Sequence, residues 1–339
     1  MTRPRTRRLR GSAIAVALAT LLAGPAYAVR PPAVAGSPHT LGGAGAAAGA
    51  PAPGFVTFAW GRTLWAHGCN PGTPVQPGVR TLEQTAQDLA AYGLRGVGGV
   101  VIDRTTATRV CARGVTTTSW ADLTRLATRY GWSYVSQSMT YTRMTTLTTN
   151  AQRYRESGAT LPILAGRGHT KAWGAFFYPD DEQDLAAQRV VSRYFAFGRL
   201  YVLEATPNIK AAATRFPYPV LTYTPLGGRC ADESLPCHDI VVRNDRITHS
   251  PDEIAQALNP PAGQWSVIQM FRLVEGKSGT LGQANAWDCT SPDWRARWTG
   301  IPENYCRNSL LDALARRDPT ARNVTFAEMA TRWGRTPSG

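Results

Sequence analysis

The sequence lacks several features that would each point to a particular class of protein. Its longest strongly apolar stretch, residues 13–22, is about half the roughly 20 residues that a membrane-spanning helix needs. It has no Cys-x-x-Cys pair, which argues against a structural zinc site. It also has no Gly-x-Ser-x-Gly motif, which argues against a serine nucleophile elbow. These absences leave a chain with 43% hydrophobic residues, enough to bury a large core.

The first 28 residues have the pattern of a secretory signal. Five arginines and no acid occupy residues 1–10, an apolar run follows, and Ala26-Tyr27-Ala28 offers a small-x-small cleavage site. The arginines leave both general secretion and twin-arginine export open. Residues 29–53 are rich in Pro, Gly and Ala and are expected to be a linker, so we predict one domain over residues 54–339 of a secreted or cell-envelope protein.

Acidic residues are scarce, since 23 Asp and Glu face 37 Lys and Arg. The formal charge of +14 falls to +9 without the five signal arginines, and the remaining excess is spread along the chain. Nucleic-acid binders concentrate such charge in a patch, so we expect no nucleic-acid partner. A solvated surface is the simpler interpretation, with attraction to an anionic cell envelope as an alternative.

The six cysteines are an even number in a chain expected to be exported, which predicts three disulfides. Local pairing is favoured because each neighbouring pair brackets a loop-like stretch. The predicted bonds are Cys69–Cys111, Cys230–Cys237 and Cys289–Cys306.

From Gly54 onward, apolar runs alternate with helical patterns. Strands are expected at 55–60, 97–102, 134–139, 175–178, 200–203, 220–223 and 265–274, with a last helix at 309–316. Thr81 with Gln84, and Ser119 with Asp122, form capping boxes that open helices, and Asp180 or Asp181 is expected to cap the helix that carries Leu185. The alternation predicts a parallel α/β fold, either a barrel or a doubly wound sheet.

Reactive groups in such folds lie where strands end. Candidates there are Asp103, Asp180, Asp181 and Glu204, with His169 in the glycine-rich stretch before the fourth strand. If a barrel brings these residues to one mouth, they could form an acid/base or metal site. The alternative for the aspartates is a structural role as helix caps or loop salt bridges.

The order of four segments resembles the polysaccharide deacetylase (NodB homology) family. They are FVTFAWGR (55–62), GWSYVSQSMTYTRMTTL (131–147), AFFYPDDEQDLAAQRVVSRYFAFGR (175–199) and WSVIQMFRLVE (265–275), so the resemblance covers most of residues 54–274. It implies an incomplete (β/α) barrel, here with disulfide-stapled loops. It also implies removal of acetyl groups from amino sugars with a bound divalent metal.

The chain departs from that family at the residues that carry the chemistry. Ala59 and Trp60 stand where the resemblance places two aspartates, and Gln137 and Tyr141 stand where it places two metal-binding histidines. The third motif lacks its arginine, and the last strand lacks a late histidine. Gln is a weak neutral ligand and Tyr binds metal well only as phenolate, with an ordinary pKa near 10. We therefore expect no metal and no cofactor.

Aromatic residues gather around the same motifs. Trp60, Trp65, Trp173 and Phe176 could stack on sugar rings, or they could simply fill the core. The sequence thus predicts a secreted, monomeric deacetylase-like protein that acts on or binds an extracellular or cell-wall polysaccharide through a non-standard site. A non-catalytic glycan-binding pseudoenzyme and a structural envelope protein remain alternatives.

Overall fold

The computed structural model describes residues 53–61, 78–108, 110–112, 115–202, 220–222, 239–243, 251–270, 272–278, 287–289, 304–332 and 334. All of them belong to one compact unit, Ala50–Gly339. The predicted signal segment and nearly all of the predicted linker lie outside the described residues. Among the described helices, none has the length and apolar character needed to cross a membrane.

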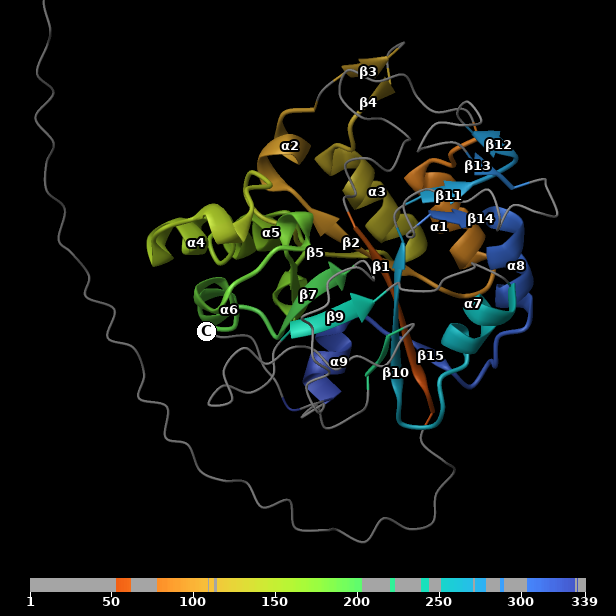
Figure 1. Cartoon of the computed structure of the whole chain (residues 1–339). Helices are drawn as coiled ribbons and strands as arrows, with labels where there is room; N and C mark the ends of the chain where they lie inside the picture. Colours follow the sequence, from red (N-terminus) through yellow and green to blue (C-terminus); the bar gives the residue numbers. More distant parts are fainter. Residues whose placement is uncertain are drawn as a thin grey trace, which may run out of the picture. The chain divides into compact units, whose positions relative to one another are not determined.

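Strands and helices alternate along most of the chain (Figure 1). The strands are β1 (Phe55–Trp60), β2 (Gly96–Val100), β3 (Val110–Ala112), β4 (Val115–Thr116), β5 (Ser133–Ser136), β6 (Ala175–Phe177), β7 (Phe197–Val202), β8 (Val220–Thr222), β9 (Asp239–Arg243), β10 (Trp265–Met270), β11 (Arg272–Val274), β12 (Lys277–Ser278), β13 (Trp287–Asp288), β14 (Asn304–Cys306) and β15 (Arg322–Asn323). The helices are α1 (Leu82–Ala90), α2 (Ile102–Thr106), α3 (Trp120–Tyr130), α4 (Asn150–Glu156), α5 (Thr160–Gly166), α6 (Leu185–Val191), α7 (Pro251–Leu258), α8 (Arg307–Ala315) and α9 (Phe326–Arg332), with the single turns η2 (Met144–Thr146), η3 (Ala172–Gly174) and η4 (Pro179–Asp181).

The main sheet has nine strands in the order β8-β10-β1-β2-β5-β6-β7-β9, with β15 added to the start of β1. Every pairing in it is parallel. The two end strands, β8 and β9, also approach each other, although no ladder joins them among the described residues. A parallel sheet whose two edge strands approach each other without pairing is an incomplete (β/α) barrel. The barrel is therefore confirmed and the doubly wound sheet is not.

Two predicted capping boxes open the helices on one side of the sheet. In α1 the Thr81 hydroxyl accepts from the Gln84 N–H, and the Gln84 side chain accepts from the Thr81 N–H. Ser119 and Asp122 do the same in α3, which ends at Gly131 with φ at 68°, a value that glycine adopts without strain. The caps fix where α1 and α3 begin. The buried leucines of these two helices then pack against β1, β2 and β5.

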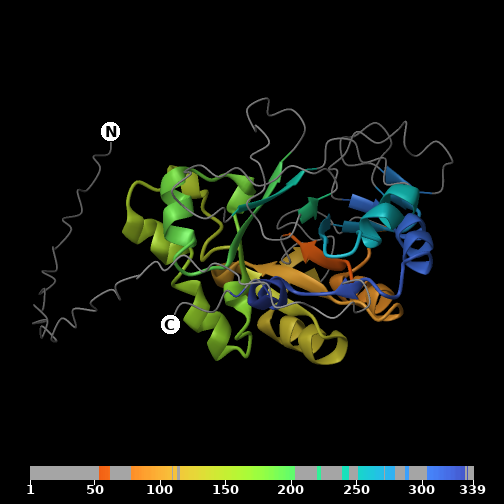
Figure 2. The ribbon, with the colours of Figure 1, turned by 90° about the horizontal axis from the view of Figure 1, so that it is seen from below.

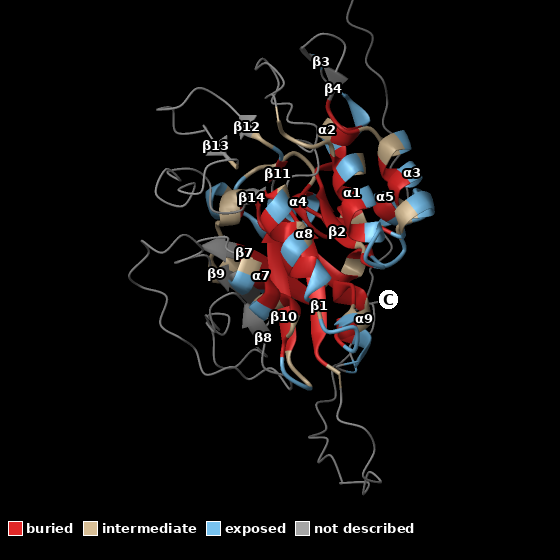
Figure 3. Cartoon of the chain, turned by 90° about the vertical axis from the view of Figure 1, so that its right-hand side faces the viewer, coloured by how far each residue is buried: buried red, intermediate tan, exposed pale blue. Residues whose placement is uncertain are grey.

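Alternate residues of each strand pack on opposite faces, and two core clusters result. On the helix side, Val56, Phe58 and Trp60 of β1 pack with leucines of α1, α3, α7 and α8. On the inner side, Phe55 and Ala59 pack with side chains of β2, β5, β6, β7, β10 and α9. Buried residues accordingly concentrate on the strands, and exposed ones on the outer faces of the helices (Figure 3). A third cluster joins α6 to β6 and β7. In the view from below, the green helices α4 to α6 and the blue helix α8 lie at opposite ends of the sheet (Figure 2).

The C-terminal segment covers the inner core at the amino ends of the strands. Phe326 of α9 is fully buried and packs edge to face on Phe177 and Trp265, with ring centroids 5.6 Å apart in both pairs. The buried Thr57 hydroxyl accepts from the Trp265 indole N–H at 2.9 Å and donates to the Val324 carbonyl at 2.6 Å. This hydroxyl therefore ties β1 to β10 and to the C-terminal segment at once.

Several predicted elements need correction. The strand expected over 265–274 is two strands, because β11 leaves the main sheet to pair with β14. The strand expected at Leu200 begins at Phe197, and β9 and α9 were not predicted at all. Neither Asp180 nor Asp181 caps α6, because Asp184 does so by accepting from the Ala187 N–H at 2.7 Å.

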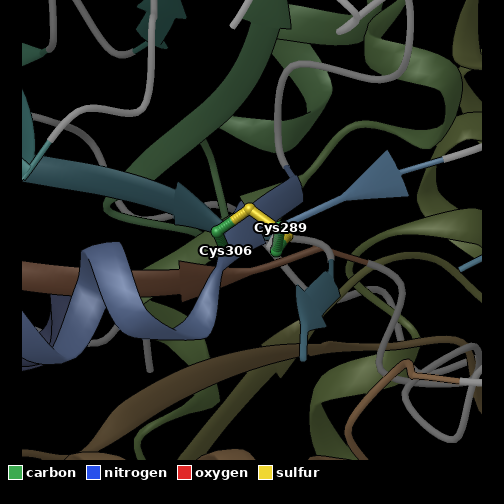
Figure 4. The surroundings of a disulfide bond; sticks show 2 residues. All are labelled: Cys289 and Cys306. Atoms are coloured by element: carbon green, nitrogen blue, oxygen red, sulfur yellow. A yellow bond between two sulfur atoms is a disulfide. The ribbon is translucent and has the colours of Figure 1, made fainter. Parts of the chain in front are cut away.

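The predicted Cys289–Cys306 disulfide is present and closes a separation of 17 residues (Figure 4). Cys306 is buried at the end of β14, directly before α8, so the bond fixes the start of that helix to the segment after β13. The other two predicted bonds, Cys69–Cys111 and Cys230–Cys237, involve Cys69, Cys230 and Cys237, which lie outside the described residues.

Candidate functional site

The altered motif positions lie at the carboxyl ends of β1 and β5, but their side chains do not share one environment. Ala59 is fully buried on the inner face. Trp60 is 1% exposed and faces the helices, where its ring lies 6.0 Å from that of Trp132. Gln137 is 2% exposed and lies against Gly99. A Cβ built on Gly99 would lie 2.8 Å from the Gln137 Oε1, so no larger residue fits there without a shift. Within the described residues, no three His, Cys, Asp or Glu side chains could hold a metal ion together.

These residues do not fit the divalent metal that the resemblance implies. Alanine has no ligand atom, and a buried tryptophan turned toward the helices cannot supply one. The amide of Gln137 is a neutral oxygen donor and carries no charge to balance a cation. Tyr141 would have to ionise before it could bind well. No metal-dependent step can therefore be derived for this edge of the sheet.

The loops that follow β5 and β6 share an unusual backbone conformation. Ser138 and Tyr141 have φ values of 84° and 71°, and Asp180 and Asp181 have 50° and 57°. Non-glycine residues in this left-handed region are strained, and such residues cluster at functional loops. The two loops also contact each other, because the Asp180 N–H donates to the Tyr141 hydroxyl at 3.4 Å and Arg143 bonds the Asp180 carboxylate at 2.9 Å. The strain is thus concentrated at one place on the carboxyl edge.

A buried arginine lies on the inner face beside these loops. Arg199 of β7 is 1% exposed, donates through Nη1 to the Asp181 carboxylate at 2.9 Å, and lies 4.3 Å from the ring centroid of Phe177. Its Nε atom is buried without a hydrogen-bond partner. A buried N–H donor without a partner costs folding free energy. The Arg199 Nε would therefore bind a hydrogen-bond acceptor favourably.

Gln269 of β10 lies next to the same guanidinium. It is 3% exposed, and its Oε1 atom is buried without a hydrogen-bond partner. A Cβ placed on Gly61 would lie 2.5 Å from the Gln269 Nε2 and 3.7 Å from the Arg199 Nη2, so the glycine keeps both groups uncovered by a side chain. We call Arg199, Asp181, Gln269 and Gly61 the inner polar cluster. It contains one buried donor and one buried acceptor that have no hydrogen-bond partner among the described residues.

The described candidates for catalysis, Asp103 and His169, lie in different local environments. Asp103 is exposed in the first turn of α2, after β2. His169 lies on the helix side, with its ring 4.8 Å from that of Tyr134 and 6.4 Å from that of Trp120. Burial lowers the pKa of His169, so the imidazole is neutral at neutral pH. Asp103 and His169 therefore lie in different surroundings, their catalytic role stays a prediction, and Glu204 lies outside the described residues.

The predicted aromatic platform is also corrected. Trp60 and Phe176 are 1% and 0% exposed, so neither offers a ring face to a sugar. Trp173 is half-buried and packs against the inner core cluster, and Trp65 lies outside the described residues. Sequence reasoning missed Arg199, whose signal was a charged residue at an inner position of the apolar strand FGRLYV.

Comparison with known proteins gives distant structural matches only. No family model matches the sequence. No curated protein matches it significantly. The solved structures that resemble it include a family 4 carbohydrate esterase from Streptomyces lividans, with 14% identity, a TM-score of 0.36, and coverage of 78% of this chain and 86% of that one. A carbohydrate esterase domain of a multidomain xylanase from the hindgut metagenome of Trinervitermes trinervoides has 11% identity, a TM-score of 0.41, and coverage of 85% and 94%. A polysaccharide deacetylase from Bacillus cereus has 13% identity, a TM-score of 0.32, and coverage of 43% of this chain and 39% of that one.

These solved structures are carbohydrate esterases and a polysaccharide deacetylase, the kind of protein that the four sequence segments resemble. Their TM-scores are low, so the fold assignment rests on the strand order, the parallel pairing and the approach of β8 to β9. The chain is an incomplete (β/α) barrel that carries polar residues at the carboxyl ends of its strands, with distant structural similarity to carbohydrate esterases and polysaccharide deacetylases.

Proposed function

We propose that this chain is a secreted, polysaccharide deacetylase-like protein that binds an extracellular or cell-wall polysaccharide without metal-dependent deacetylation. The observation that carries the proposal is the inner polar cluster. It places a buried donor, the Arg199 Nε, near a buried acceptor, the Gln269 Oε1, and neither has a hydrogen-bond partner. Both residues are almost fully buried, so a sugar hydroxyl or amide group would pair with them after a local movement of the side chains that cover them.

The charge balance of the cluster favours a neutral polar ligand group. The Asp181 carboxylate already compensates the Arg199 guanidinium through a contact of 2.9 Å. An added anion would therefore meet a pair with no net charge, whereas a neutral group needs only the two unused hydrogen-bonding positions. The loss of acidic and imidazole groups at Ala59, Trp60, Gln137 and Tyr141 removes the ligands that a deacetylase metal would require.

The test compares binding and turnover in the same purified protein. Calorimetry with chitooligosaccharides and soluble peptidoglycan fragments should detect binding, while an acetate-release assay with and without added zinc should detect no turnover. The Gln269→Leu variant should weaken binding by about tenfold or more, because it removes the amide oxygen and the amide NH2 and keeps the side-chain volume similar. Gln264→Leu is the matched control, since Gln264 precedes the same strand at its opposite end.

Two results would overturn the proposal. Acetate release that depends on added metal would show that deacetylation survives. Absence of binding to every polysaccharide tested would leave a structural role in the envelope as the remaining interpretation.

A further inference from the structure

A second polar region lies at the opposite edge of the sheet, at the amino ends of the strands. A cavity of about 780 Å³ lies between the segment before β2, the end of α3 and the C-terminal segment with β15 and α9. Five arginines line it, namely Arg95, Arg129, Arg317, Arg322 and Arg332, and Glu328 is the only acid among the lining residues that the structure describes. The lining therefore carries an excess of four positive charges in a small volume.

Local carboxylates compensate only part of this charge. Arg95 forms a forked contact with Glu328, with both oxygens at 2.7 Å, and the exposed Arg129 reaches Glu83 at 3.4 Å. By contrast, Arg317, Arg322 and Arg332 form no ion pair with a carboxylate within the described part of the chain. Arg332 instead lies over the Phe55 ring, 5.0 Å from its centroid. Three arginines of the lining thus have no carboxylate partner of their own in the part of the chain that the structure describes.

Arg317 shows how these groups are held. Its Nη2 donates to the Ala321 carbonyl at 2.7 Å, while its Nε is buried without a partner. The neighbouring Asp318 carboxylate accepts from the N–H and the hydroxyl of Thr320, at 2.8 and 2.7 Å. The Tyr130 hydroxyl, which also belongs to the lining, is buried without a partner. Two lining residues of the cavity thus carry a buried donor that has no hydrogen-bond partner in the described part of the protein.

We propose that this cavity binds a ligand that carries two or more closely spaced phosphate groups. Guanidinium groups bind phosphate oxygens in a forked geometry, and several phosphates bring enough negative charge into a small volume to balance the lining. The source can be a free oligophosphate or a phosphodiester-linked polymer of the cell surface. This site is separate from the inner polar cluster, so its existence does not depend on the glycan-binding proposal.

The experiment is calorimetric titration of the purified chain with tripolyphosphate, with poly(glycerol phosphate) and with citrate as a carboxylate comparator. Tripolyphosphate should bind more tightly than citrate, and the affinity should fall as salt is raised. Preference for poly(glycerol phosphate) over tripolyphosphate would assign the ligand to the polymer source, and the reverse would assign it to a free oligophosphate; both results support the site.

Variants locate the binding. The double variant Arg322→Gln with Arg332→Gln should weaken tripolyphosphate binding by about tenfold or more, and both residues are exposed, so folding should be kept. Arg317→Gln should have an effect of similar size. The matched control is Arg155→Gln with Arg193→Gln, two exposed arginines that do not line the cavity. An equal loss in the control, equal affinity for citrate, or no binding of either phosphate probe at low salt would overturn the proposal.

Discussion

The buried pair of Arg199 and Asp181 allows a prediction in which the charge is removed without disturbing the backbone. Asp181 has φ at 57°, a conformation that asparagine tolerates as well as aspartate does, so Asp181→Asn changes the charge alone. Arg199 then keeps a guanidinium that is 2% exposed and has lost its carboxylate. We expect the variant to be less stable because the buried charge is no longer compensated.

The size of the effect follows from the geometry. Two charges about 4 Å apart attract by about 4 kcal/mol at an effective dielectric constant of about 20. Breaking a buried pair typically costs about 3–5 kcal/mol. The Asp181 side chain is 21% exposed, so water replaces part of the lost interaction. We therefore expect Asp181→Asn to lower the free energy of unfolding by about 2–3 kcal/mol, measured by urea denaturation with disulfides intact.

The adjacent residue supplies the control. Asp180 also has a positive φ, but its ion pair is with Arg143, whose side chain is 52% exposed, so Asp180→Asn should cost less than about 1 kcal/mol. In an Arg199→Met background, Asp181→Asn should cost less than in the parent chain, since the buried guanidinium is gone. Equal costs for the two asparagine variants, or a full cost in that background, would refute the reasoning.

Three further predictions concern stability. Burial lowers the folded-state pKa of His169, so its contribution is complete above about pH 6.5 and is lost as the pH falls below that value; His169→Phe should therefore narrow the difference between melting temperatures at pH 7.5 and 5.5. Unchanged pH dependence in that variant would contradict this. Replacing Cys289 and Cys306 together by serine should lower the free energy of unfolding by roughly 3 kcal/mol, as expected for a loop of this length, and a loss below about 1 kcal/mol in urea denaturation would be too small. Thr57→Val removes the buried hydroxyl that donates to the Val324 carbonyl and should cost about 1–3 kcal/mol by the same assay, whereas a neutral effect would show that the bridge is unimportant.

The parts of the fold that depend on local signals could be predicted from the sequence. The capping boxes at Thr81 and Ser119 involve residues only three positions apart, and both form as expected. The β1 strand was also predicted with its observed bounds, because five of its six residues have high strand propensity and it stands between loop-like segments. Local chemistry therefore fixed where several elements begin.

The parts that depend on distant contacts could not be predicted. The helix after β6 begins at Asp184 rather than at Asp180 or Asp181, although all three acids are plausible caps, because Asp181 is instead drawn to Arg199 on the next strand. His169 stands near a strand in sequence, yet only the packing of Tyr134 shows that it faces the helices. The inner polar cluster joins residues from two strands, β7 and β10, and from the segments that follow β1 and β6, so no single stretch of sequence displays it.

The way in which the C-terminal segment completes the core has a consequence for the order of folding during synthesis. The Thr57 hydroxyl bonds the Val324 carbonyl across 267 residues, and β1 pairs with both β10 and β15. The strand β1 can pair with β2 early, but it waits for most of the chain before β10, β15 and its inner-face cover exist. Contacts of such long sequence separation form slowly. The nascent chain consequently stays without its finished core until translation is almost over, and chains that stop before residue 322 should accumulate as unfolded or degraded products.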